Sequence, residues 1–364
     1  MKWFKLKKKR STMFQVVRNA LIFVAAWGLV ATFANFGLMG AVRGLANILV
    51  AVATAYLTHI IFYMVEDAKE GKVFETFTAR VSANWKKVQR GVPEITALII
   101  GIRLQIATPI LIIIIASVIA ELVGKLMWGG FGKNKLNPVA VSILLVRVLF
   151  DQYLLMPALP GATDAIAAAT PLSVKALEGW SFTAENYALI QQQVGGLWNL
   201  LIGNFPGIMA ETTRIASFIA LGYMIHKKAL KWEVPAFYVG TVFVGAAIIG
   251  LFHGYIWSYA LYHVLSGGLV FGAIFMATDP VTIPKNKAGQ IVFAILLGML
   301  TLAIRINSEL FHEGVMVGLV IMNMFTTYIN EKTSALNKEP QKKQWATYGG
   351  LIAASTLIVF LLSF

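Results

Sequence analysis

Cysteine is absent from this chain of 364 residues. Its absence excludes disulfides, thiolate metal sites, cysteine nucleophiles and iron–sulfur clusters held by the chain's own thiolates. Histidine is scarce as well, and the five histidines show no spacing typical of a metal site, so we expect no bound metal. No hydrolase, kinase or nucleotide-binding signature occurs, and the sequence therefore predicts no catalytic residue of its own.

Charge is also scarce, since charged residues make up 13% of the chain and hydrophobic residues 58%. A soluble domain has about 25% charged residues. The net charge of +14 could indicate nucleic-acid binding in a soluble protein. In a membrane protein it is typical of cytoplasmic loops that follow the positive-inside rule, so we expect no nucleic-acid partner.

Apolar runs recur along the whole chain, and a helix needs about 20 residues to cross a bilayer. The first run follows six basic residues and lacks a small-residue cleavage site, so it is typical of a retained anchor. The sequence predicts an all-α polytopic membrane protein with about 10–11 transmembrane segments. The eleven candidate segments are 17–38, 42–65, 92–103, 105–127, 137–156, 195–225, 234–252, 257–278, 289–306, 311–330 and 345–364.

The distribution of lysine and arginine predicts the orientation. Residues 1–10 and 66–91 each hold six basic side chains, and connections rich and poor in these residues alternate along the chain. We therefore expect a cytoplasmic N-terminus and an outer location for the long connection 157–194.

Five predicted segments precede that outer connection, and an odd number in each half is what an inverted repeat requires. Each half also contains a glycine-rich, polar break, at 129–138 and at 203–213. Broken helices of this kind predict a site near the membrane midplane between the repeats, although two ordinary turns remain the alternative. The predicted divisions are a basic arm (1–16), a first repeat (17–156), an external loop (157–194), a second repeat (195–330), and a linker with an additional helix (331–364).

Four acidic residues fall within or beside apolar segments, where a carboxylate costs at least ~2.5 kcal/mol. Glu121, Glu211 and Asp279 are therefore candidates for an ion path. Each has a structural alternative: Glu121 can pair with Lys125 four residues on, and Glu211 can cap a helix. Asp279, like Glu313, lies near the end of a predicted segment, where water or a helix N-terminus can satisfy it.

The external loop contains the sequence DAIAAAT at residues 164–170. It resembles the flavinylation motif D-x-x-S/T-G-A-T of the RnfD/NqrB family, which comprises membrane subunits of ion-translocating ferredoxin:NAD and NADH:quinone oxidoreductases. In that family the motif threonine carries FMN through a phosphoester bond on the outer side of the membrane. The resemblance assigns covalent FMN to Thr170, with Ala169 before it and Asp164 at the motif's first position. Ala167 and Ala168 depart from the motif.

Three other stretches strengthen the resemblance, which runs from about residue 92 to 330. The sequence GGFGKNKLNP at 129–138 is similar to the family's GGxGxNxxNPA signature, and 203–213 is similar to GNxPGxxGE-(T/V)-S. Residues 266–281, SGGLVFGAIFMATDPV, nearly copy the GGxxxGxxFMATDPV block. The additional apolar segment 345–364 departs from the family pattern, and the short N-terminal arm resembles RnfD more than NqrB.

The resemblance implies a subunit of a redox-driven translocase for Na⁺ or H⁺, in a bacterial or archaeal cytoplasmic membrane. It implies FMN and a second, non-covalent flavin, usually riboflavin, and partner subunits that carry the iron–sulfur centres. The rival interpretation is a solute channel or transporter, because inverted repeats with broken helices occur in both classes. The residues expected to bind the second flavin are Gly129, Gly130, Asn134, Asn137 and Glu211.

Overall fold

The computed structural model describes residues 2–154, 195–205, 207–252, 254–308, 311 and 313–362, and side-chain burial from residue 13 to 361. No strand occurs in this described part, which is built of helices joined by turns. The predicted all-α architecture is therefore confirmed. The predicted FMN site, Asp164 to Thr170, lies outside the described residues.

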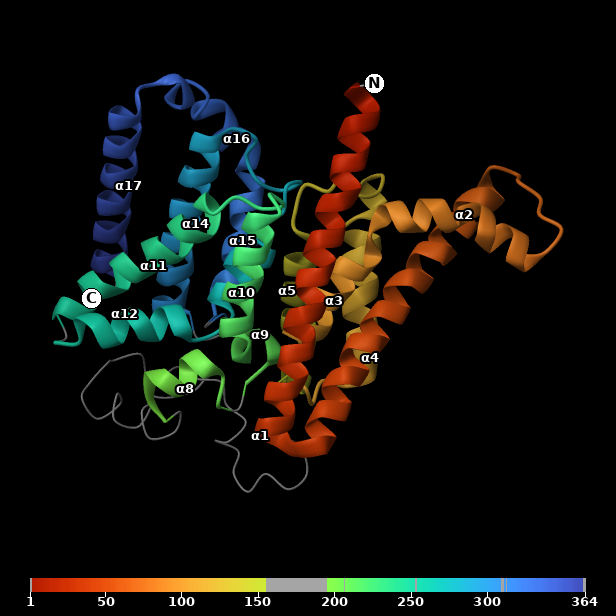
Figure 1. Ribbon diagram of the computed structural model, residues 1–364, viewed down its shortest axis with the longest axis horizontal. Helices are drawn as coiled ribbons and strands as arrows, with labels where there is room; N and C mark the ends of the chain where they lie inside the picture. Colours follow the sequence, from red (N-terminus) through yellow and green to blue (C-terminus); the bar gives the residue numbers. More distant parts are fainter. Residues whose placement is uncertain are drawn as a thin grey trace.

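The first element, α1 (Lys2–Lys69), is a helical hairpin rather than one rod. Gly37 interrupts it with a φ of +68° and a ψ of −167°. Only glycine adopts such a conformation without strain, because it has no Cβ. The two arms lie side by side in Figure 1, and they correspond to the predicted segments 17–38 and 42–65.

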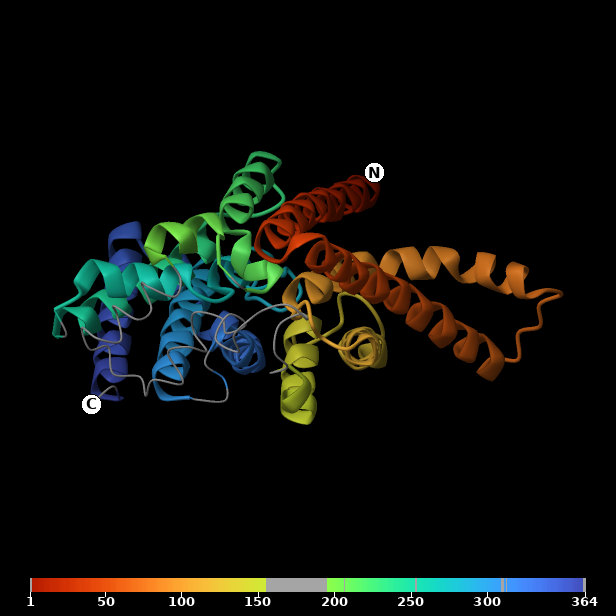
Figure 2. The same cartoon turned by 90° about the horizontal axis from the view of Figure 1, so that it is seen from below.

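The rest of the first half packs against this hairpin. Gly101 in α3 allows close contact with α1, because a Cβ there would lie 2.7 Å from the Cα of Ile48. A single π-helical turn follows α4, and Figure 2 shows that the end of α1 and α2 project away from the bundle. The helices of this half are α2 (Phe77–Gly91), α3 (Pro93–Arg103), α4 (Ile110–Val118) and α5 (Pro138–Leu154), with the π-helical turn at Ile119–Val123 and a 3₁₀ turn at Leu126–Trp128.

The second half contains several short helices in place of single long ones. The predicted segment 195–225 is divided among α8, α9 and α10, and 257–278 is bent by 54° between α12 and α13. The helices are α8 (Gly196–Ile202), α9 (Met209–Thr212), α10 (Arg214–His226), α11 (Glu233–Phe252), α12 (Ile256–Leu265), α13 (Leu269–Phe275), α14 (Lys287–Asn307), α15 (Val315–Met324), α16 (Thr326–Lys332) and α17 (Gln341–Leu362).

Within the described residues, five helical stretches are long and apolar enough to cross a membrane, or six if the bent pair α12–α13 counts as one. This number is lower than the eleven predicted segments for two reasons. The hairpin α1 contains two of the predicted segments, and others are short or broken, such as the 11-residue α3. Non-helical backbone at membrane depth must be covered by protein or line a cavity, so the breaks mark where a site can form.

The two halves share one continuous apolar core, which extends from Val16 to Val359. Figure 1 shows α1 to α5 on one side and α11, α14 and α17 on the other, with α9, α10 and α15 between them and α8 below α12. The helix α1 contacts α9 and α10, so the halves meet at the broken helices. The division into inverted repeats stays a prediction.

Candidate functional site

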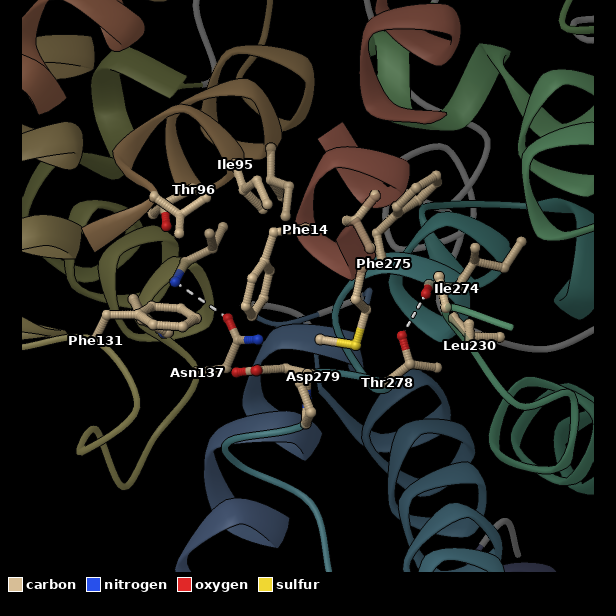
Figure 3. Close-up of a pocket in the computed structure, with 18 of the residues that line it drawn as sticks. Phe14, Ile95, Thr96, Phe131, Asn137, Leu230, Ile274, Phe275, Thr278 and Asp279 are labelled. Carbon is tan, nitrogen blue, oxygen red and sulfur yellow. Dashed lines mark hydrogen bonds between the residues drawn. The ribbon is translucent and has the colours of Figure 1, made fainter. Parts of the chain in front are cut away.

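A pocket opens where the first and second halves meet. Its wall comes from the start of α1 and of α3, from residues 125–139, from the end of α10, and from the stretch after α13. Its empty volume, which includes the open mouth, is about 830 Å³. Figure 3 shows Phe14, Phe131 and Phe275 around this space together with Asn137 and Asp279.

Asn137 holds the polar floor of the pocket together. Its side-chain oxygen accepts hydrogen bonds from the backbone N–H groups of Val139 and Ala140, both at 3.1 Å, and thereby caps α5. Its own N–H donates to Oδ1 of Asn323 at 2.8 Å, and its Nδ2 donates to the carbonyl of Met276 at 3.3 Å. Pro138 follows at the first helical position, where its missing N–H costs nothing. Asn137 therefore ties the 129–138 break to the second half.

Asn134 differs from Asn137 because it has unused hydrogen-bonding capacity. Its Nδ2 donates to the carbonyl of Leu136 at 3.1 Å, whereas its Oδ1 is buried and has no partner among the described residues. A buried acceptor without a partner is costly, and a bound ligand can remove that cost. Asn134 is one of the residues that line the pocket.

Asp279 also lines the pocket, but its carboxylate is engaged locally. Its oxygens accept from the backbone N–H of Val281 and from the hydroxyl of Thr282, both at 3.1 Å. The neighbouring Thr278 donates its hydroxyl to the carbonyl of Ile274 at 2.6 Å. The carboxylate therefore stabilises the turn after α13, and these contacts differ from the helix N-terminus that was the predicted alternative.

The residues that line the pocket suit an aromatic ring with polar edges, such as a flavin. Phe14 and Phe131 meet edge to face with ring centroids 5.1 Å apart and supply apolar surface. Asn134 offers an unused acceptor and Thr96 a hydroxyl, while Lys125 contributes positive charge to the wall. An isoalloxazine presents both an apolar body and a hydrogen-bonding edge, so the residues fit this group.

A second polar group lies at the break between α12 and α13. We call Arg103, Glu211, Arg214, Arg305 and Glu313 the central arginine cluster. The guanidinium of Arg103 forms an ion pair with Glu313, whose other oxygen accepts from the N–H of Gly268 at 2.9 Å. These contacts tie the end of α3 to the turn before α15.

The other two arginines of the cluster bind mainly backbone carbonyls. Arg305 donates to the carbonyls of Glu313 at 2.8 Å and Ser266 at 3.3 Å, and also to that of His263. Arg214 donates to the carbonyls of Leu200 at 2.6 Å and Gly267 at 3.5 Å. Carbonyl groups freed by broken helices are thus satisfied by buried guanidinium groups.

Glu211 lies in the same cluster and is only 4% exposed. Its Oε2 has no hydrogen-bond partner in the described part of the chain. The sequence pattern singled out Glu211 but not the buried Arg103 and Arg214. Both arginines could have been found from the sequence, because a charged residue inside an apolar segment is rare and usually functional.

Glu121 belongs to a third group, in the first half. Its carboxylate lies 3.1 Å from the ammonium of Lys125, so the predicted pairing four residues apart is confirmed. It also lies 2.7 Å from Nε2 of His59, a contact that the sequence did not predict. We call these three residues the buried triad.

The structure therefore separates the predicted site residues. Asn134, Asn137 and Asp279 come together in the pocket, whereas Gly129 and Gly130 lie in the adjoining turn outside its wall. Glu211 belongs to the central arginine cluster. No group of three His, Asp or Glu side chains in the described ranges could hold a metal ion.

Comparison with known proteins places these features in context. A family model described as the NQR2, RnfD, RnfE family matches residues 5–337. The D subunit of the proton-translocating ferredoxin:NAD(+) oxidoreductase complex of Clostridium ljungdahlii is 32% identical over 264 residues, which cover 72% of this chain and 78% of that protein. The D subunit of the Na(+)-translocating ferredoxin:NAD(+) oxidoreductase complex of Acetobacterium woodii is 29% identical over 240 residues, covering 66% and 70%.

A third similar protein comes from a related complex. The B subunit of the Na(+)-translocating NADH-quinone reductase of Chromohalobacter salexigens is 27% identical over 262 residues, which cover 70% of this chain and 61% of that protein. The helix α17 begins at Gln341, beyond the end of the family match at residue 337.

Proposed function

Because the chain belongs to the NQR2, RnfD, RnfE family, we propose that it is a membrane subunit of an ion-translocating electron-transport complex. The Rnf type, with ferredoxin and NAD⁺ as the redox partners of the complex, is favoured over the Nqr type. The Clostridium ljungdahlii protein is 32% identical with 78% of its length covered, against 27% and 61% for the Chromohalobacter salexigens protein.

The chain's share of the activity is to hold flavins and to place them for electron transfer. A bound flavin supplies the electron-carrying chemistry, and the protein supplies position and electrostatics. Thr170 in the external loop is the proposed attachment point for FMN, with Asp164 and Ala169 completing the motif. Partner subunits must carry any iron–sulfur relay, because this chain has no cysteine.

The pocket is the proposed site of a second, non-covalent flavin, and the unused Oδ1 of Asn134 is the single observation that carries this assignment. Phe14 and Phe131 would exclude water from the ring face, and Asn134 would orient its edge by accepting an N–H. Asn137 would fix the floor of the site through its bonds to both halves. Translocation of Na⁺ or H⁺ would use intramembrane carboxylates, with Glu121, Glu211 and Asp279 as candidates.

The absorption spectrum of the purified full chain tests this proposal. After expression with its flavin transferase, we expect a yellow protein with two flavins, one released and one retained on denaturation. The retained flavin reports the covalent site, and the released riboflavin reports the pocket. A colourless protein would contradict the proposal and favour the rival solute channel or transporter, which shares the broken helices but needs no flavin.

The proposed location is a bacterial or archaeal cytoplasmic membrane, with the N-terminus inside and the loop 157–194 outside. The apolar helices and the basic N-terminal residues support this orientation. Cysteines introduced singly at Lys72 and Ser173 would test it by labelling in intact cells. An impermeant maleimide should label position 173 and not position 72, and the reverse pattern would contradict the orientation.

A further inference from the structure

The buried triad is a charged group that reaches the pocket through Lys125. Nε2 of His59 lies 2.7 Å from Oε2 of Glu121, and Nζ of Lys125 lies 3.1 Å from the same oxygen. The Lys125 side chain is 3% exposed and the other two are fully buried. Of the three, only Lys125 lines the pocket. The pocket is therefore closest to the positive end of a buried charge pair.

The surrounding backbone is shaped to hold this arrangement. Glu121 lies in the π-helical turn Ile119–Val123, and such turns occur frequently at functional sites. The carbonyl of Gly91 accepts from Nζ of Lys125 at 3.4 Å, and a Cβ at Gly91 would lie 2.3 Å from Cε1 of His59. Gly91, at the end of α2, thus contacts Lys125 through its carbonyl and lies so close to His59 that no side chain would fit at position 91.

A purely structural pair explains these contacts poorly. Removing two charges from water costs more than their attraction commonly returns, and apolar residues of similar size often stabilise a protein as well or better. A helix-stapling pair would also not need to face a cavity. Nζ of Lys125 instead lies 5.9 Å from the ring centre of Phe131 in the pocket wall, and its counter-charge Glu121 does not line the pocket.

We propose that Lys125 is a positioning residue that makes the pocket prefer the electron-rich, reduced form of a bound ring over its oxidised form, with Glu121 and His59 fixing its ammonium. This inference rests on the function proposed above. Reduction adds electron density to an isoalloxazine, and a nearby cation stabilises that form most where water is excluded. The carboxylate of Glu121, which does not line the pocket, weakens this stabilisation of the reduced ring. The pair therefore favours the reduced form less than Lys125 would alone.

The test uses the full chain in lipid nanodiscs, with Thr170→Val as the parent so that only non-covalent flavin is seen. Riboflavin is the probe, and its midpoint potential in the pocket is measured by spectroelectrochemistry alongside its oxidised-state affinity. Lys125→Met should lower the ratio of reduced to oxidised affinity by about tenfold, which is about 30 mV for a two-electron couple. Glu121→Gln should raise that ratio, because the cation then lacks its counter-charge.

The double variant E121Q/K125M separates electrostatics from folding. It carries no buried charge in the pair, so we expect it to melt near the parent temperature and to show a ratio between the parent and Lys125→Met. Lys125→Arg should keep the parent ratio. Equal ratios in all variants that bind riboflavin, or single-variant shifts in the same direction, would overturn this proposal alone. A parent that binds no riboflavin would overturn the pocket assignment and this proposal with it.

Discussion

At the scale of single residues, Asn134 and Asn137 show how two amides three positions apart differ in their tasks. Asn137 uses its side chain and its N–H to join α5 to Met276 and Asn323, so its contribution is to the fold. Asn134 is buried and keeps one oxygen without a partner among the described residues. Substitution of Asn137 would therefore disturb the pocket and the protein together, whereas substitution of Asn134 probes ligand binding.

Asn134→Leu should weaken riboflavin binding. The substitution removes the unused acceptor that we assign to the flavin edge, and a lost hydrogen bond costs about 1 kcal/mol, or roughly fivefold to tenfold in affinity. Fluorescence quenching of added riboflavin measures the change. Asn307→Leu is the matched control, since Asn307 is exposed at the end of α14 and should leave the affinity unchanged. Parent-like affinity in Asn134→Leu would contradict the assigned contact.

At the scale of elements, the break between α12 and α13 organises the central arginine cluster. Its carbonyls accept from Arg214 and Arg305, and Gly268 donates its N–H to Glu313. A Cβ at 268 would displace this ion pair, because it would lie 1.7 Å from Nη1 of Arg103 and 2.6 Å from Oε1 of Glu313. The bend is therefore held by one ion pair and by hydrogen bonds from arginine to carbonyl groups, rather than by turn propensity alone.

Gly268→Ala should destabilise the protein strongly. The added methyl group displaces the ends of Arg103 and Glu313, and loss of this pair leaves the buried Arg103 without its counter-charge, at a cost of up to about 3–5 kcal/mol. The melting temperature in detergent measures the effect. Gly222→Ala in α10 is the control, because a Cβ there meets nothing within 4 Å and should be neutral or stabilising by up to about 1 kcal/mol. Equal melting temperatures for the two variants would contradict the role of the cluster.

Hydropathy predicted which stretches are apolar and helical, and glycine-rich motifs predicted where helices break. Hydropathy did not predict that 195–225 forms three helices. No local pattern could predict that Asn137 meets Asn323, because this contact spans 186 residues of chain. The burial of Arg214 and the pairing of His59 with Glu121 likewise depend on helix packing that no local pattern encodes. The cost of a carboxylate beside an apolar segment singled out Asp279, and the polar break together with the resemblance singled out Asn134.

At the scale of the whole molecule, the two halves share an apolar core and meet at their broken helices. The pocket draws its wall from both halves, and the central arginine cluster joins α3 of the first half to the turn before α15 of the second. The family match covers both halves up to residue 337, so we assign the proposed electron-transfer role to the two halves together. The external loop would add the covalent flavin to this frame.

The central claim is that this chain carries a covalent flavin on Thr170. In-gel flavin fluorescence of the denatured full chain, expressed with its flavin transferase, tests it most directly. Thr163→Val should fluoresce like the parent and Thr170→Val should be dark, because only Thr170 follows Asp164 at the motif spacing. Fluorescence that survives in Thr170→Val, or a parent protein without fluorescence, would contradict the account.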